Sequence, residues 1–202
     1  MIISDCIQLS EEWFREKAGV PSASNFDKIV TSKGEPSKQS VKYLYQLAGE
    51  NIVGLKTETY QNEAMKRGVV LEAEARNLFA MVHDVSVRQV GLIYKDARKT
   101  CLCSPDGIIG EEAGLEIKCP LIHTHVSYLL KGELPTDYIQ QVQGSMMVTG
   151  FSSWWFESYF PGLPPLILKI ERDNIFIEKL EKELNRFVED LAITIKKLKG
   201  ML

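Results

Sequence analysis

Residues 103–120 read CSPDGIIGEEAGLEIKCP, and this segment predicts a β-hairpin with a polar cluster at one end. Residues 101–109 and 115–118 have the composition of short strands, and the acidic turn at 110–114 joins them. Side chains alternate along a strand, so Glu116 and Lys118 share one face while Ile117 points into the core. The hairpin also brings Asp106 beside Glu116. Two carboxylates and one ammonium group are therefore expected to converge.

A cluster of this kind suits the hydrolysis of a phosphodiester. Mg²⁺ binds through one or two carboxylates, polarises a phosphate and supplies an activated water. A neighbouring lysine can orient that water or offset the developing charge. The alternative is that Asp106 is only a turn residue and that Glu116 and Lys118 form a solvated strand face, because Pro-Asp-Gly is a common turn signal. Each half of the pattern alone favours this alternative, but both halves at the ends of one hairpin favour a metal site.

The rest of the chain predicts an α/β fold with a mixed central sheet flanked by helices, in one domain over residues 1–202. A helix is expected to start near Ser24 and Asn25, and Ser37 is the expected N-cap of a second helix that continues to Ile52. Hydrophobic periodicity predicts further helices at 61–83, 122–131, 136–149 and 173–199. Further strands are expected at 85–94, 152–160 and 166–171.

Charge and composition are compatible with an enzyme that acts on nucleic acids. The net charge of −3 argues mildly against a protein that simply coats DNA, but a metal-dependent nuclease carries carboxylates that its cations neutralise. Residues 15–46 hold six basic and three acidic side chains, which indicates either a phosphate-facing region or a solvated helical surface. No run reaches the roughly 18 apolar residues of a membrane span, and no secretion signal or disulfide pattern is visible. A cytoplasmic protein is expected.

The same residues carry a family resemblance. Pro105-Asp106 followed by Glu116-Ile117-Lys118 resembles the PD-(D/E)xK pattern of nucleases with a restriction-endonuclease-like core. The longer string resembles the family of phage lambda exonuclease and viral recombinases, the alkaline exonucleases. Further blocks match in order, from about residue 13 to residue 190. They are Ser22-Ala23-Ser24, Arg67-Gly68 with Glu72, Ala75 and Phe79, residues 138–149, and Ile170-Glu171-Arg172-Asp173.

The resemblance implies roles for residues at the reaction centre. Asp106 and Glu116 would be metal ligands, joined by the backbone carbonyl of Ile117, and Lys118 would serve the nucleophilic water. Glu72 would hold water around a second metal ion. Gln141 would also contact the active centre. The implied cofactor is Mg²⁺, with two ions expected and Mn²⁺ as a substitute.

The resemblance also implies contacts with DNA. Ser24 would bind a phosphate at the cleavage end. Lys17 stands where the family has an arginine for the 5′-phosphate, and Arg15 could compensate for the missing bidentate fork. Met65 could be an apolar wedge that splits the terminal base pairs, although ordinary helix packing carries more weight for a helical methionine.

The implied function is a Mg²⁺-dependent 5′-to-3′ exonuclease that degrades one strand of linear double-stranded DNA. It would leave a 3′ single-stranded overhang for phage-type recombination. The family implies a homotrimeric ring around DNA ends, a phage single-strand-annealing protein as partner, and a phage or prophage gene expressed in the bacterial cytoplasm. The alternatives are a structure-specific or restriction-type endonuclease on the same core, and a non-catalytic DNA-binding or annealing module.

Two other groups of residues invite a functional interpretation. His123 and His125 match no common zinc spacing and are expected at the surface or near DNA. Trp154, Trp155 and Phe156 could stack on bases, but on a strand they are expected to form sheet core.

Overall fold

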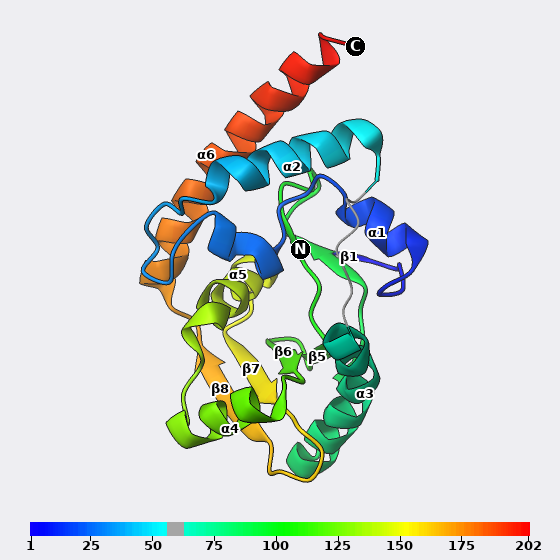
Figure 1. The fold of residues 1–202 in the computed structure, drawn as a ribbon, viewed down its shortest axis with the longest axis vertical. Helices are drawn as coiled ribbons and strands as arrows, with labels where there is room; N and C mark the ends of the chain where they lie inside the picture. Colours follow the sequence, from blue (N-terminus) through cyan, green and yellow to red (C-terminus); the bar gives the residue numbers. More distant parts are fainter. Residues whose placement is uncertain (56–62) are drawn as a thin grey trace.

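The computed structural model describes residues 1–55 and 63–202, and the side chains of residues 63–66 lie outside the described part. Figure 1 shows a sheet in the lower half of the molecule, with α3 (Glu63–His83) to its right and α5 (Ile139–Thr149) above it. The long α6 (Asn174–Lys199) crosses α2 (Ser40–Val53) in the upper half. The expected α/β fold with helices flanking a mixed sheet is confirmed.

The main sheet has five strands in the order β2-β5-β6-β7-β8. They are β2 (Val87–Arg88), β5 (Gly107–Ile109), β6 (Ala113–Lys118), β7 (Ser153–Ser158) and β8 (Leu166–Glu171). β6 and β7 pair in parallel, while the other neighbours pair antiparallel, so the sheet is mixed. The hairpin of β5 and β6 is present as expected, with Gly107 opposite Leu115.

A second sheet was not expected. It has three strands in the order β1-β3-β4, namely β1 (Ile2–Ser4), β3 (Leu92–Tyr94) and β4 (Leu102–Cys103). The expected strands at 85–94 and 101–109 are therefore each divided between the two sheets. The chain passes from the main sheet to the second sheet at Gly91, the first crossing between the sheets. Only glycine fits there, because a Cβ would stand 1.9 Å from the carbonyl oxygen of Cys6. The chain passes back to the main sheet at Asp106, the second crossing between the sheets. The carboxylate of Asp106 therefore lies in a turn, although the segment around it has the composition of a strand.

The two faces of the main sheet are covered by different helices. Leu115 and Ile117 of β6 pack with Ala75 and Phe79 of α3, together with other apolar side chains. The opposite face forms the larger core, in which Trp154 packs with residues of α2, α5 and α6. Because side chains alternate on β6, Glu116 and Lys118 point away from α3 and toward the α5 side of the sheet.

Most helix boundaries match the sequence patterns. α4 (Ile122–Lys131) spans its expected range, and η2 (Thr136–Tyr138) continues into α5. The side chain of Asp173 caps α6 by accepting from the amide of Phe176. The prediction for Ser37 is wrong, since α2 begins at Ser40 with Gln39 as its N-cap and Ser37 Oγ accepts from the amide of Gln39.

Two short helices precede these elements. α1 (Glu11–Lys17) starts after Ser10, whose hydroxyl accepts from the amide of Trp13. η1 (Ala23–Lys28) is a 3-10 helix that begins after Ser22, close to the expected start. η1 packs tightly on α5, because a Cβ on Gly144 would lie 2.4 Å from Cδ2 of Phe26. This close approach sets the distance between Ser24 and the side chains of α5.

Burial decides the two remaining interpretations. Trp154 and Phe156 are fully buried and Trp155 is half-buried, so the expected sheet core is confirmed. The surface assignment of His125 is wrong, because its ring is fully buried and contacts Ser158 Oγ at 2.8 Å and the carbonyl oxygen of Pro164 at 3.1 Å. It ties α4 to the end of β7. Within the described residues, every helix is too short or too polar to cross a membrane.

Candidate active site

The hairpin brings the three key side chains together. Asp106 is anchored at both ends, since its amide donates to the carbonyl of Leu115 at 3.0 Å and its Oδ2 accepts from the amide of Ile117 at 2.6 Å. Lys118 Nζ lies 2.5 Å from Glu116 Oε1. The amide nitrogen of Gln141, which comes from α5, donates to the same oxygen at 2.6 Å. Asp106, Glu116, Lys118 and Gln141 therefore form one connected cluster.

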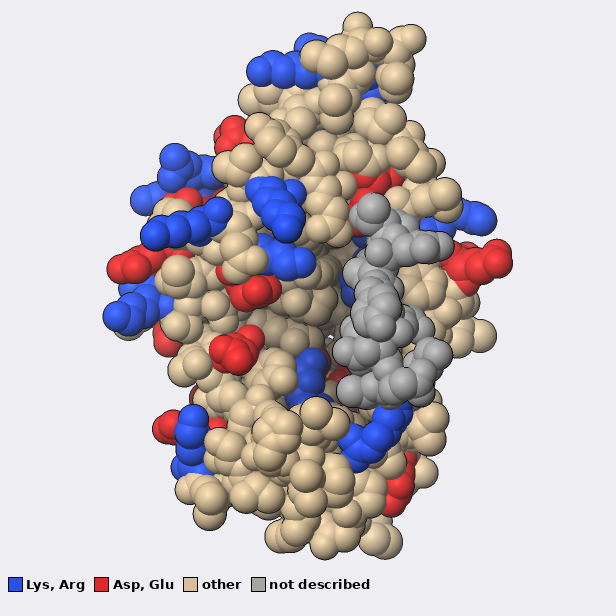
Figure 2. All heavy atoms as spheres, in the orientation of Figure 1, with Lys and Arg blue, Asp and Glu red and all other residues tan. Residues whose placement is uncertain are grey.

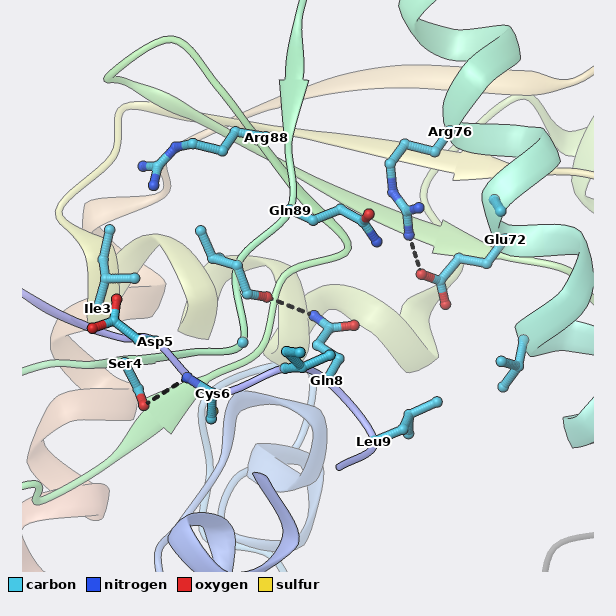
Figure 3. A pocket seen from close by; sticks show the side chains of 15 residues that line it. Ile3, Ser4, Asp5, Cys6, Gln8, Leu9, Glu72, Arg76, Arg88 and Gln89 are labelled. Atoms are coloured by element: carbon cyan, nitrogen blue, oxygen red, sulfur yellow. Dashed lines mark hydrogen bonds and ion pairs between the residues drawn. The ribbon is translucent and has the colours of Figure 1, made fainter. Parts of the chain in front are cut away.

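Glu72 joins this cluster from α3 through Arg76. The guanidinium of Arg76 forms an ion pair with Glu72 one helical turn away, and its Nε donates to the carbonyl oxygen of Asp106 at 2.8 Å. With its amide oxygen turned toward the guanidinium, Gln89 accepts from both terminal nitrogens of Arg76, at 2.9 and 3.2 Å. Figure 3 shows Arg76 and Glu72 pointing toward each other from α3. Arg76 thus fixes the position of α3 relative to the Asp106 turn.

A pocket of about 190 Å³ opens over the cluster. Figure 2 shows a narrow hollow near the middle of the face that it presents, with basic and acidic atoms inside it. The expected site residues that line it come from five elements and from the second crossing between the sheets. They are Lys17, Ser24, Glu72, Asp106, Glu116 and Gln141.

The candidate DNA-binding residues divide into two groups. Lys17 is buried beside the pocket, with its Nζ 4.3 Å from the centre of the Trp13 ring, and Ser24 is exposed at the pocket rim. Arg15 is exposed elsewhere on α1 and does not line the pocket, so the structure does not bring it to the site. The side chain of Met65 lies outside the described residues. Of the basic residues in 15–46, Lys17 is the one that lines this pocket.

Burial and mutual repulsion shift the pKa values of the charged side chains in this cluster. Burial, followed by the charges of Glu116 and Glu72, raises the pKa of Asp106 well above its ordinary value. Burial also raises the pKa of Glu72, although Arg76 opposes the change. Burial alone would lower the pKa of Lys118, but Glu116 and Asp106 raise it overall, so this side chain remains an ammonium ion. A bound divalent cation would relieve the repulsion among the carboxylates.

The donor set fits Mg²⁺ in an open site. Among the side chains of residues 1–55 and 67–202, no three carboxylate, imidazole or thiolate groups form a ready-made cage for a metal ion. Mg²⁺ does not need such a cage, because it usually keeps several waters and binds one or two carboxylates together with substrate phosphates. Asp106 and Glu116 supply these two carboxylates at the floor of a pocket that is open to solvent. The carbonyl of Ile117 stays a proposed third ligand.

Several residues of the site were not found from the sequence. Neither Arg76 nor Ser104 was assigned a role from the sequence. Ser104 lines the pocket, accepts from Trp13 Nε1 at 3.1 Å and donates to the carbonyl of Gly91 at 2.7 Å. The Tyr138 ring centre lies 5.0 Å from Lys118 Nζ, and both residues line a second opening of about 290 Å³. The placement of Arg76 one turn after Glu72 is the signal that could have identified it.

Comparison with known proteins points to one family. Residues 12–152 match the YqaJ-like viral recombinase domain. The fold is similar to that of an alkaline exonuclease (LHK-Exo) from Laribacter hongkongensis, with a TM-score of 0.86 and 32% identity over 95% of this chain and 97% of that chain. The structure of LHK-Exo in complex with dAMP matches over the same shares with a TM-score of 0.85. No curated protein matches the sequence.

A more distant structure supports the fold alone. The phage-related exonuclease from Haemophilus somnus 129PT has a TM-score of 0.70 and 15% identity, over 91% of this chain and 96% of that chain.

Proposed function

The chain belongs to the YqaJ-like viral recombinase family, and we propose on this premise that it is a Mg²⁺-dependent exonuclease acting on ends of double-stranded DNA. The similarity to LHK-Exo, an alkaline exonuclease, supports the nuclease activity. The observation that carries the proposal is the convergence of Asp106, Glu116 and Glu72 in one solvent-open pocket, with Lys118 paired to Glu116. We further propose 5′-to-3′ polarity, a 3′ single-stranded product for recombination, a trimeric ring and an annealing-protein partner, all on the family resemblance.

The chemistry divides between cation and protein. When bound, Mg²⁺ would polarise the scissile phosphate and lower the pKa of a water, which is the contribution that metal ions make to phosphodiester hydrolysis. Asp106 and Glu116 would hold it. Gln141 orients Glu116 by donating to Oε1, and the anchored amide of Ile117 orients Asp106.

Lys118 would serve the attacking water from its place beside Glu116. In the protein without a metal ion, Glu116 and Asp106 raise its pKa, so the side chain is an ammonium ion there. As an ammonium ion it can donate hydrogen bonds to the attacking water or to a phosphate oxygen and stabilise the negative charge that develops there. Tyr138 and Glu116 restrict its position from two sides.

The end of the DNA strand would be recognised beside this cluster. Lys17 and Ser24 line the same pocket and supply an ammonium and a hydroxyl to a terminal phosphate. A lysine offers a point charge in place of the bidentate fork of an arginine, so we expect a weaker discrimination between 5′-phosphate and 5′-hydroxyl ends.

One experiment separates this function from its alternatives. The protein is incubated with linear duplex, 5′-hydroxyl linear duplex and closed circular DNA, with and without Mg²⁺, and the linear strands carry different fluorophores on bases close to their 5′ and 3′ ends. We expect loss of the 5′ label from linear DNA only in Mg²⁺. Cutting of the closed circle would indicate an endonuclease instead, and no cleavage with retained DNA binding would indicate a binding module.

Two variants test the assigned roles. We expect Asp106→Ala to abolish cleavage and Lys118→Ala to reduce the rate by about 10²–10³-fold, the usual effect of removing one group that stabilises transition-state charge. Both variants should fold and bind duplex DNA. Full activity in either variant would refute the role given to that residue.

A further inference from the structure

The backbone of Leu9 is strained beside the active-site pocket. Its φ of 64° lies in the left-handed region, which residues with a Cβ rarely adopt. The other described non-glycine residues with positive φ are Asp84 and Lys99, and both are exposed polar residues outside this pocket. Strained backbone is often kept at functional sites, where the surrounding structure holds it in place.

The turn that contains Leu9 is held on both sides. Gln8 Nε2 donates to the carbonyl of Val90 at 3.0 Å and to that of Pro105 at 2.8 Å, so it bridges the two crossings between the sheets. After Leu9, the amide of Ser10 donates to the carbonyl of Ile7 at 3.1 Å, and Ser10 caps α1. The conformation of Leu9 is therefore imposed by its neighbours.

The apolar side chain of Leu9 is left half in solvent. Its exposed fraction is 48%, and that of Val69 on α3 is 50%. Figure 3 shows Leu9 extending from the N-terminal segment toward α3.

Leu9 and Val69 stand between two pockets. Both residues line the 190 Å³ pocket that contains Asp106 and Glu116, and both line a neighbouring pocket of about 460 Å³. Gln8 and Glu72 also line both of these pockets. The apolar pair therefore forms a rim directly beside the carboxylates.

We propose that Leu9 and Val69 bind the sugar and base of the nucleotide whose phosphate reaches the carboxylate cluster. This inference rests on the proposed function and adds the contact for the nucleoside. The polar groups of the pocket suit phosphates, whereas deoxyribose carbon atoms and the faces of bases need apolar partners. A leucine and a valine contact the face of any base equally well, so the contact is independent of sequence.

The test compares ligands with and without a nucleoside. Binding of dAMP and of inorganic phosphate is measured by calorimetry in Mg²⁺ for the wild type, Leu9→Gly and Leu9→Met. Glycine adopts positive φ without strain, so Leu9→Gly should fold, which its thermal unfolding checks. We expect Leu9→Gly to weaken dAMP binding about tenfold, because that factor corresponds to roughly 55 Å² of lost apolar contact. Phosphate binding should not change, and Leu9→Met should bind dAMP like the wild type.

A second pair of variants provides a matched control on α3. Val69→Thr should weaken dAMP binding in the same direction as Leu9→Gly. Val70→Thr should have no effect, because Val70 is exposed and lines neither of the two pockets. Equal effects of the two threonine variants would overturn the proposal.

The remaining outcomes separate this proposal from the proposed function. Unchanged dAMP binding in Leu9→Gly, or an equal loss of dAMP and phosphate binding, overturns the nucleoside contact even if the protein degrades DNA. A selective loss of dAMP binding supports the contact even if the protein cuts no DNA, in which case the nuclease assignment fails alone. A wild type that binds dAMP no better than phosphate also overturns the contact.

Discussion

Replacing Glu157 by methionine should stabilise the folded protein, and the gain should grow with pH. Glu157 lies on β7 opposite Ile117 and Ile167, on the face of the sheet that α3 covers. It is fully buried, and neither carboxylate oxygen has a hydrogen-bond partner among the described residues. Burial raises its pKa from 4.5 to about 8, with Arg76 acting in the opposite direction.

The magnitude follows from linkage between protonation and folding. A carboxyl whose pKa is raised in the folded state does not lower the free energy of unfolding while the pH is below its unfolded pKa of 4.5. The folded protein then loses stability as the pH rises from 4.5 to about 8, the pKa of Glu157 in the folded state. With 1.36 kcal/mol for each pH unit, the penalty is about 1 kcal/mol at pH 5, about 3 kcal/mol at pH 7 and nearly 5 kcal/mol at pH 9. Methionine removes this penalty and has a similar volume.

The measurement is urea unfolding followed by circular dichroism at pH 5, 7 and 9, in EDTA. Glu157→Gln serves as the control, because it removes the charge but keeps a buried polar group. Its difference in unfolding free energy from the wild type should grow with pH as it does for methionine, but should be smaller at every pH. Asp106 and Glu72 also have raised pKa values, but their contribution cancels between wild type and variants. A difference in unfolding free energy that stays constant from pH 5 to pH 9 would refute the reasoning.

Three further predictions concern the site. Because Asp106 has a raised pKa and would lose its proton on binding a cation, Mg²⁺ affinity should increase as the pH rises above the ordinary pKa of an aspartate in calorimetric titrations, and a flat profile would contradict this. Arg76→Met should lower kcat about 10–100-fold with little change in KM, because Arg76 positions both Glu72 and the Asp106 turn. Arg76→Lys should restore part of the lost kcat. A loss of stability without a change in kcat would show that Arg76 has only a structural role. Gly144→Ala should destabilise the protein by about 1–3 kcal/mol in urea unfolding, because its Cβ would clash with Phe26, while Gly49→Ala, with no atom near its Cβ, should be neutral or stabilising.

Local patterns predicted those parts of the structure that depend on local interactions. The hairpin of β5 and β6 needs only a turn and two adjacent strands, and the long helices α3, α5 and α6 follow from apolar spacing. The convergence of Asp106, Glu116 and Lys118 is likewise a consequence of hairpin geometry and strand alternation.

Long-range contacts set the parts that the sequence did not predict. The division of 85–94 into two strands depends on Gly91 meeting Cys6, more than 80 residues away in the chain. His125 resembles any polar residue on an amphipathic helix, and its burial follows from partners in β7 and in the loop before β8. Arg15 and Lys17 are two residues apart in sequence, yet only Lys17 reaches the pocket, because a helix turns through roughly 200° between them.

The bridging role of Gln8 has a practical consequence for handling the protein. Its side-chain amide joins the carbonyl groups of Val90 and Pro105, next to Asp106, while β1 just before it forms the edge of the smaller sheet. Trimming the first nine residues would therefore release the loop that carries Asp106, the proposed metal ligand, although those residues supply no acid or amine to the proposed chemistry. Purification tags and fusions are better joined after α6, whose last turns extend away from the site in Figure 1.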